Sequence, residues 1–251
     1  MLKDLIRQTL RSTGYEIVRY QRPESRSMPS DVSAIDRAII EAVRPFTLTS
    51  NERLISLINA VRFITRNRIP GAIAECGVWK GGSIMAAALT LLDEGDGERE
   101  LYLYDTFDGM TKPTEEDISY DGVSAEEQLK NTPVGEGVWC VSKLEEVEAN
   151  IKRTEYPWDK IHFITGKIED TIPKQNPPQL AILRLDTDWY SSTKHELEHL
   201  FPLLNQGGFL IIDDYGHWEG ARKAVDEFLD TLPVKYFLHR IDDTGRLLIK
   251  Q

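Results

Sequence analysis

Two apolar runs that each end in paired carboxylates constrain this chain more than any other feature of its sequence. Residues 180–186 end in Asp186 and lead to Asp188, and residues 209–213 end in Asp213 and lead to Asp214. An apolar run without alternation is typical of a strand buried on both faces of a sheet. If the two strands are parallel neighbours, about 4.8 Å apart, the four carboxylates gather at one edge of the sheet.

Such a concentration of negative charge is unfavourable unless a cation lies beside it. A hard divalent cation such as Mg²⁺ prefers oxygen ligands, and three carboxylates would suffice to hold it. The cation would lower the pKa of a bound substrate hydroxyl, and the fourth carboxylate could act as the base. The alternative is structural, with Asp213 or Asp214 capping one helix and Asp188 capping the helix that follows it.

The overall charge of the chain restricts its partners. The 251 residues carry a net charge of -11, which argues against non-specific binding to nucleic acid or anionic membranes. No apolar run approaches the roughly 20 residues that span a bilayer, so no integral membrane segment is expected. The two cysteines, Cys76 and Cys140, form no disulfide framework, which favours a reducing, cytoplasmic location.

Strand and helix patterns alternate from about residue 71 onward. Strands are predicted at residues 72–75, 101–105, 161–165, 180–186 and 209–213. Helices are predicted at residues 84–92, 143–153, 192–204 and 219–232. This alternation predicts an α/β fold with a mostly parallel sheet, to which a hairpin over residues 235–250 adds an antiparallel strand. The long segment 106–142 either shapes an acceptor pocket or is a surface insertion.

The first 70 residues differ in character from the rest. They predict a helical extension with a short amphipathic helix at residues 2–10, a loop at 21–31 and a helix at 33–43. Thr49 with Glu52 predicts a capping box before the next helix. This extension carries no recognisable chemistry. It could be a layer packed on the domain at 71–251, a dimer contact or a substrate lid.

A glycine-rich turn follows the first strand. Glu75 ends the strand, and Gly77 begins a turn that leads to Ser83 at the start of a helix. Glycines let the backbone turn sharply and approach a ligand closely. Trp79 replaces the middle glycine of a dinucleotide-binding pattern, and the acidic Glu75 precedes the turn. Both features favour a cationic, phosphate-free ligand over a pyrophosphate. A tight turn without a ligand is the alternative.

Other polar residues lie close to the predicted strands. Asp105 ends the second strand, where a carboxylate can accept hydrogen bonds from a ribose diol; it could instead face solvent and cap the next loop. Arg184 lies within a core strand and requires a partner, either Asp105 or a carboxylate of the cluster. His217 and Trp218 follow the second aspartate pair and could line the substrate site or lie on the surface.

Taken together, four segments of the sequence resemble the macrocin O-methyltransferase (TylF/MycF-type) family, whose members methylate sugar hydroxyls on macrolide and aminocoumarin antibiotics. The segments are Glu75-x-Gly77-x-x-x-Gly81-Gly82-Ser83, Asp105-Thr106-Phe107-x-Gly109, Leu183-Arg184-x-Asp186-x-Asp188 and Ile212-Asp213-Asp214-Tyr215. The first segment is also similar to the corresponding turn of catechol O-methyltransferase.

The resemblance implies a Rossmann-like class I methyltransferase fold with a seven-stranded sheet, S-adenosylmethionine as the methyl donor and Mg²⁺. The implied metal ligands are Asp186, Asp213 and Asp214, and the implied general base is Asp188. The residues implied to border the methyl donor are Glu75, Gly77 and Ser83 around its methionine part, Asp105 at its ribose, and Gly166 and Ile168 near its adenine. Asp186 is implied to contact the donor as well.

The sequence therefore predicts an O-methyltransferase that acts on a hydroxyl next to another hydroxyl, on a small-molecule or glycan acceptor, most plausibly a sugar. A homo-oligomer is expected from the resemblance. The rival functions are a metal-dependent glycosyltransferase that uses Asp186-x-Asp188, a catechol-type O-methyltransferase, and a protein that keeps the fold without turnover.

Overall fold

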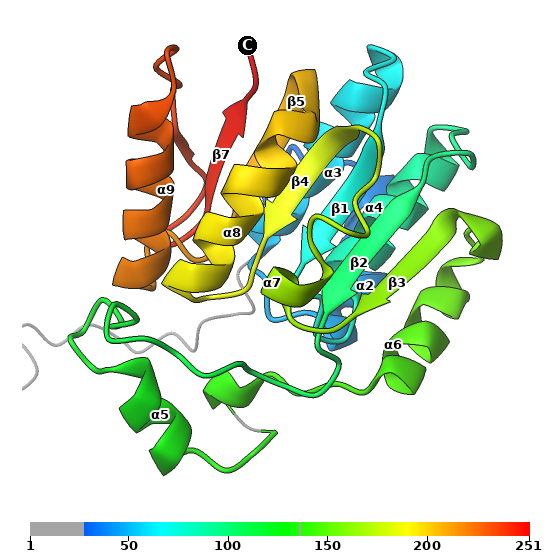
Figure 1. Cartoon of the computed structure of the whole chain (residues 1–251). Coiled ribbons are helices and arrows are strands. Elements are labelled where there is room, and N and C mark those ends of the chain that lie inside the picture. Colours follow the sequence, from blue (N-terminus) through cyan, green and yellow to red (C-terminus); the bar gives the residue numbers. More distant parts are fainter. Residues whose placement is uncertain (1–27, 136) are drawn as a thin grey trace, which may run out of the picture. The chain divides into compact units, whose positions relative to one another are not determined.

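One seven-stranded sheet runs through the part of the chain that this computed structural model describes, residues 28–135 and 137–251 (Figure 1). The strand order is β3-β2-β1-β4-β5-β7-β6. The strands are β1 (Ala72–Cys76), β2 (Leu101–Asp105), β3 (Ile161–Thr165), β4 (Leu180–Leu185), β5 (Leu204–Ile212), β6 (His239–Arg240) and β7 (Arg246–Ile249). The predicted helix at residues 2–10, and most of the predicted loop at 21–31, lie outside the described residues.

The direction of the strands confirms the predicted fold class. Strands β1 to β5 pair in parallel, whereas β7 is antiparallel to both β5 and β6. Strand β5 begins at Leu204, earlier than predicted. The prediction started the strand after Gly207 and Gly208, because two glycines usually mark a break between elements. The strand instead continues through them with a shift of register against β4 between Leu180 and Ile182.

Helices cover both faces of the sheet (Figure 1). One face carries α2 (Ala34–Val43), α3 (Asn51–Arg66), α4 (Gly82–Asp93) and α6 (Leu144–Ile151). The other face carries α7 (Ile168–Thr171), α8 (Tyr190–Leu200) and α9 (Glu219–Thr231). The segment 106–142 holds the short helix α5 (Ala125–Asn131) and lies beyond the carboxyl ends of the strands (Figure 1). Neither α5 nor α7 was predicted, because each is too short to show a period.

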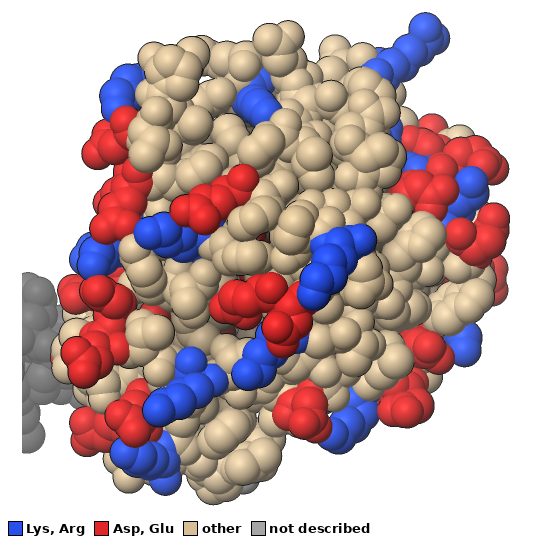
Figure 2. All heavy atoms as spheres, viewed as in Figure 1, with Lys and Arg blue, Asp and Glu red and all other residues tan. Residues whose placement is uncertain are grey.

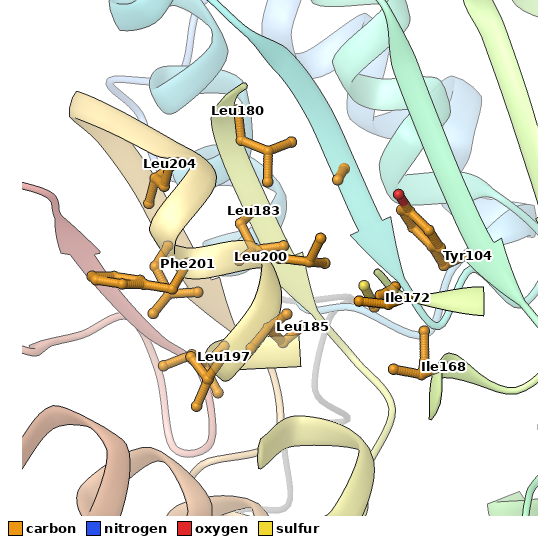
Figure 3. Close-up of a cluster of buried hydrophobic side chains, with 14 of the residues drawn as sticks. Tyr104, Ile168, Ile172, Leu180, Leu183, Leu185, Leu197, Leu200, Phe201 and Leu204 are labelled. Atoms are coloured by element: carbon orange, nitrogen blue, oxygen red, sulfur yellow. The ribbon is translucent and has the colours of Figure 1, made fainter. Parts of the chain in front are cut away.

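Leucine and isoleucine side chains form the core between β4 and α8. Leu197 and Leu200 of α8 point toward Leu183 and Leu185 of β4 (Figure 3). All four are at most 1% exposed. Since burial of one such side chain contributes about 1.5–3 kcal/mol, this layer fixes the position of α8 on the sheet.

Helices α2 and α3 pack against α4 as part of the compact unit that runs from Ser33 to Gln251. The side chain of Ser50, rather than Thr49, caps α3 by accepting a hydrogen bond from the backbone N–H of Arg53 (3.1 Å). The predicted capping box of Thr49 with Glu52 is therefore wrong by one residue, and the Thr49 hydroxyl is left to contact the sheet.

Acidic and basic side chains are interspersed over the face of the molecule seen in Figure 2. Several form ion pairs across elements, such as Lys223 of α9 with Glu116 (2.8 Å). No helix among the described residues is both long enough and apolar enough to cross a membrane. Cys76 and Cys140 are both free.

The turn after β1 requires glycine at residue 77. Gly77 has φ +82°, in the left-handed region, and a Cβ atom there would overlap the carbonyl oxygen of Asp186. The backbone hydrogen bonds of Gly77 to Tyr104 (2.9 Å) and of Asp186 to Cys76 (2.8 Å) extend the sheet at this point. The first turn of the predicted ligand site is therefore packed directly against the end of β4.

We expect Gly77→Ala to destabilise the protein by about 3 kcal/mol or more, because the new methyl group adds a backbone overlap to an unfavourable φ. Chemical denaturation followed by circular dichroism measures the loss. Gly95→Ala is the matched control, since Gly95 also has positive φ (+75°) but has open space around its Cβ position. Its expected cost is only about 1 kcal/mol. Equal losses in the two variants would contradict the packing argument.

Candidate active site

A cavity of about 360 Å³ opens beyond the carboxyl ends of the parallel strands. Strands β1 and β4 are neighbours here, at the point where the strand order reverses, which is where open α/β sheets bind ligands. The structure brings all of the predicted site residues together around this cavity, which is lined by Glu75, Gly77, Ser83, Asp105, Gly166, Ile168, Asp186, Asp188, Asp213 and Asp214.

The register of the sheet places three of the acidic side chains on one face. Glu75 of β1 pairs with Arg184 of β4, which pairs with Ile211 of β5. Side chains two residues apart in a strand share a face, so Asp186 and Asp213 lie on the same side as Glu75 and Arg184. The predicted gathering of carboxylates thus follows from the pairing of three parallel strands.

Arg184 is the centre of this cluster and is only 3% exposed. Its guanidinium contacts Glu75, Asp186 (2.8 Å) and Asp213 (2.7 Å). It also donates to the hydroxyl of Thr49 (3.1 Å). Of the two partners that the sequence allowed for Arg184, the carboxylate cluster is correct and Asp105 is not.

Arg53 of α3 supplies a second positive charge that the sequence did not predict. Its guanidinium contacts Asp213 and, through Nε, Asp242 (2.9 Å) in the turn between β6 and β7. A charged residue on a helix is usually exposed to solvent, and nothing in the sequence indicates this contact with a distant turn. Helix α3 therefore contributes directly to the cavity, which Arg53 also lines.

The negative charge of the cluster exceeds the positive charge of the two arginines. Burial, opposed by Arg184, raises the pKa of Asp186 to about 6. Burial and the charge of Asp186 raise the pKa of Asp188 to about 7. Burial and the charge of Asp188 hold the pKa of Asp214 well above its ordinary value. The site therefore favours a further cation or protons.

The donor set fits a hard divalent cation in chemistry and charge, since it consists of carboxylate oxygens with excess negative charge. Among residues 28–135 and 137–251, however, no three His, Cys, Asp or Glu side chains are arranged as ready-made metal ligands. Asp213 is not free to act as a metal ligand in this arrangement, because one of its carboxylate oxygens contacts the guanidinium of Arg53 and the other contacts that of Arg184.

Asp188 lies in a sharp turn beside the cluster. It has φ +67°, unusual for a residue other than glycine, and the backbone N–H of Trp189 bonds to the carbonyl of Thr187 across it (2.8 Å). The backbone N–H of Asp188 donates to Asp214 Oδ2 (3.2 Å), and Trp218 Nε1 donates to Asp188 Oδ1 (2.7 Å).

The structural alternative for the aspartates does not describe this arrangement. Trp189 is the N-cap of α8 and Trp218 is the N-cap of α9, and neither helix is capped by Asp188, Asp213 or Asp214.

The other side of the cavity is formed by the glycine turn and the end of β2. Asp105 accepts hydrogen bonds from the backbone N–H groups of Val78 (2.7 Å), Trp79 (3.1 Å) and Phe107 (2.8 Å). The Thr106 hydroxyl is a further, longer contact of Asp105 Oδ1 (3.4 Å), so the protein itself places four donors around this carboxylate. Asp105 thus also holds the glycine turn in place, a role that the sequence did not indicate.

Residues from the segment 106–142 form part of the cavity wall, namely Thr106, Gly109, Met110, Thr111 and Cys140. The buried carboxylate of Asp117 accepts from the first helical N–H of α8, that of Tyr190 (2.7 Å), and from the backbone N–H of Thr114 (2.6 Å). Tyr120 N–H donates to the carbonyl of His217 (2.8 Å), and the side chain of His217 lines the cavity. The segment is therefore docked on the starts of α8 and α9.

Comparison with known proteins identifies the family to which this chain belongs. The family model described as macrocin-O-methyltransferase (TylF) matches residues 2–250. The 8-demethyl-8-(2,3-dimethoxy-alpha-L-rhamnosyl)-tetracenomycin-C 4'-O-methyltransferase of Streptomyces olivaceus is 34% identical over 79% of this chain and 73% of its own length. The mycinamicin III 3''-O-methyltransferase of Micromonospora griseorubida is 34% identical over 79% of this chain and 76% of its own length.

A solved structure extends the similarity to the fold. The O-methyltransferase NovP is 27% identical, covers 98% of this chain and 97% of its own, and superposes with a TM-score of 0.69. The chain belongs to the macrocin-O-methyltransferase family and is an S-adenosylmethionine-dependent O-methyltransferase.

Proposed function

We propose that the protein transfers a methyl group from S-adenosylmethionine to a sugar hydroxyl of a natural product, next to a second hydroxyl, with Mg²⁺ bound at the acidic cluster. The observation that carries this proposal is the position of Asp188 and three further aspartates beside the glycine turn, in one cavity. The names of both curated relatives support the class of reaction, and one of those names contains a rhamnosyl group.

The methyl donor would lie along the glycine turn. The positive sulfonium and amino groups of S-adenosylmethionine suit a wall that carries Glu75, and the turn at Gly77 allows close approach of the backbone. Asp105, which lines the cavity at the end of β2, is the acceptor that we assign to a ribose hydroxyl. Gly166 and Ile168 line the part of the cavity that we assign to adenine.

The same wall argues against the glycosyltransferase alternative. A sugar nucleotide would bring a diphosphate to the turn, where the carboxylate of Asp105 would repel it.

Asp188 is the proposed base. One carboxylate oxygen, Oδ1, accepts the indole N–H of Trp218, so the proton of the acceptor hydroxyl would pass to Oδ2. The acceptor oxygen then attacks the methyl carbon as the carbon–sulfur bond breaks, and neutral S-adenosylhomocysteine leaves. This transfer requires the oxygen in line with the methyl group at about 3–3.5 Å.

The residues that would hold Mg²⁺ are Asp186, Asp213 and Asp214, and Asp213 would have to exchange a guanidinium contact for the cation. When bound, the cation would orient the two neighbouring hydroxyls and polarise the one that reacts. The excess negative charge of these carboxylates supports this part of the proposal, as does the strong rise in the pKa of Asp214 through burial and the charge of Asp188.

For Asp188→Asn we expect kcat to fall by roughly 10²- to 10⁴-fold, since the amide cannot accept the proton. The affinity for S-adenosylhomocysteine, measured by calorimetry, should stay within twofold of wild type. Asp108→Asn is the matched control, because the Asp108 side chain is 80% exposed and pairs with Lys143. Near-normal turnover of a folded Asp188→Asn variant would rule out the base assignment.

For Mg²⁺ at about 100 times its Kd we expect the melting temperature of the wild-type protein to rise by roughly 5–10 °C. Asp214→Asn should melt higher than wild type without metal, because the substitution removes a buried like charge, and should lose most of the shift with Mg²⁺. Asp230→Asn, on the exposed end of α9, serves as the control with a normal shift. Full activity in excess EDTA, or an equal shift in Asp214→Asn, would argue against the metal site.

For Asp105→Ala we expect at least a tenfold loss of affinity for S-adenosylhomocysteine, because the carboxylate both faces the ribose position and holds the glycine turn. Isothermal titration calorimetry measures it, with the exposed Asp108→Ala as the control. Unchanged affinity would contradict the ribose role. Thermal stabilisation of the wild type by uridine diphosphate, and not by S-adenosylhomocysteine, would favour the glycosyltransferase alternative.

A further inference from the structure

The proposed base is in contact with a buried tryptophan. Trp218 is 2% exposed, and its Nε1 donates to Asp188 Oδ1 at 2.7 Å. A buried indole N–H requires a hydrogen-bond partner, and Asp188 provides it. The backbone of Asp188 has an unfavourable φ of +67°, a conformation that persists only where the surrounding contacts hold it.

The indole itself is held by neighbouring elements. Its ring meets that of Trp189 edge to face, with centroids 5.0 Å apart and planes at 72°. The backbone N–H of Trp218 donates to the carbonyl of Asp214 (3.0 Å), and Trp218 forms an isolated β-bridge with Ser119. Trp218 therefore has a fixed position between α9, the turn of the base and the segment 106–142.

The second indole of the pair also contacts that segment. Trp189 is fully buried, and its Nε1 donates to the carbonyl of Thr111 (3.1 Å). Thr111 lines the cavity. The segment 106–142, which forms part of the cavity wall, and the carboxylate of the proposed base are therefore connected through two indoles in direct contact.

We propose that Trp218 is a positioning residue for catalysis, whose indole N–H holds Oδ1 of Asp188 so that Oδ2 faces the acceptor hydroxyl. This inference rests on the proposed role of Asp188 as the base. A carboxylate free to rotate would share its time among several directions. Misplacement of a reacting group by about 1 Å can cost a hundredfold in rate, so one hydrogen bond at this point has a large kinetic effect.

Trp218→Phe tests the inference, because it keeps an aromatic ring against Trp189 and removes the N–H. We expect kcat to fall by about 10- to 100-fold, with KM for the acceptor and the affinity for S-adenosylhomocysteine within about twofold of wild type. Trp158→Phe is the control, since the Trp158 ring is 42% exposed and packs against Phe163, and Trp158 does not line the cavity. It should retain the wild-type kcat.

Nuclear magnetic resonance of the indole N–H groups gives a readout that does not depend on activity. The chain has five tryptophans, and Trp218→Phe identifies the signal that belongs to residue 218. Asp188→Asn should move that signal more than the signal of Trp139 or Trp158. If Trp218→Phe does not fold, sequence-specific assignment of the wild-type protein identifies the signal, and its shift in the Asp188 variant still tests the contact.

The outcomes separate the two proposals. Normal kcat in Trp218→Phe together with an inactive Asp188→Asn would overturn the positioning role alone, as would an unmoved Trp218 signal. Normal turnover in Asp188→Asn would overturn the base assignment and this inference with it. A fall in kcat in Trp218→Phe with a moved indole signal would support both.

Discussion

The structure depends above all on one buried cation, the guanidinium of Arg184. It lies among carboxylates that come from the ends of three different strands, those of Glu75, Asp186 and Asp213. Loss of one partner from a buried ion pair typically costs about 3–5 kcal/mol, because the remaining charge is left without compensation. The acidic site is thus inseparable from the assembly of β1, β4 and β5, and its geometry is set when the sheet forms.

The strand order separates two kinds of chemistry within one cavity. On the side of β1 and β2, the glycine turn allows close approach of the backbone to the proposed methyl donor. Asp105, which holds this turn, lies beside it as a carboxylate. On the side of β4 and β5, the aspartates provide negative charge and, in the proposed function, the proton acceptor. Because the carboxyl ends of parallel strands lie at the same edge of the sheet, the two sets of groups meet in one cavity.

The sequence allowed the prediction of the fold and of the residues that gather around the cavity, because continuous apolar runs ending in carboxylates indicate both the strand type and the edge where the charges meet. It did not reveal Arg53, since its partners Asp213 and Asp242 are far along the chain and a helical arginine is ordinarily solvated. The cap at Ser50 was missed because Thr49 has the same chemistry one residue earlier. Magnesium, the oligomeric state and the cytoplasmic location stay predictions.

The anchoring of the segment 106–142 through Asp117 has an evolutionary consequence. One buried carboxylate joins the start of α8 to the backbone at Thr114, so the attachment needs no particular residue at the outer part of the segment. Tyr120, only three positions further on, is 71% exposed. The outward-facing residues of the segment can therefore change in the course of evolution, while α8 and the aspartates behind it keep their arrangement.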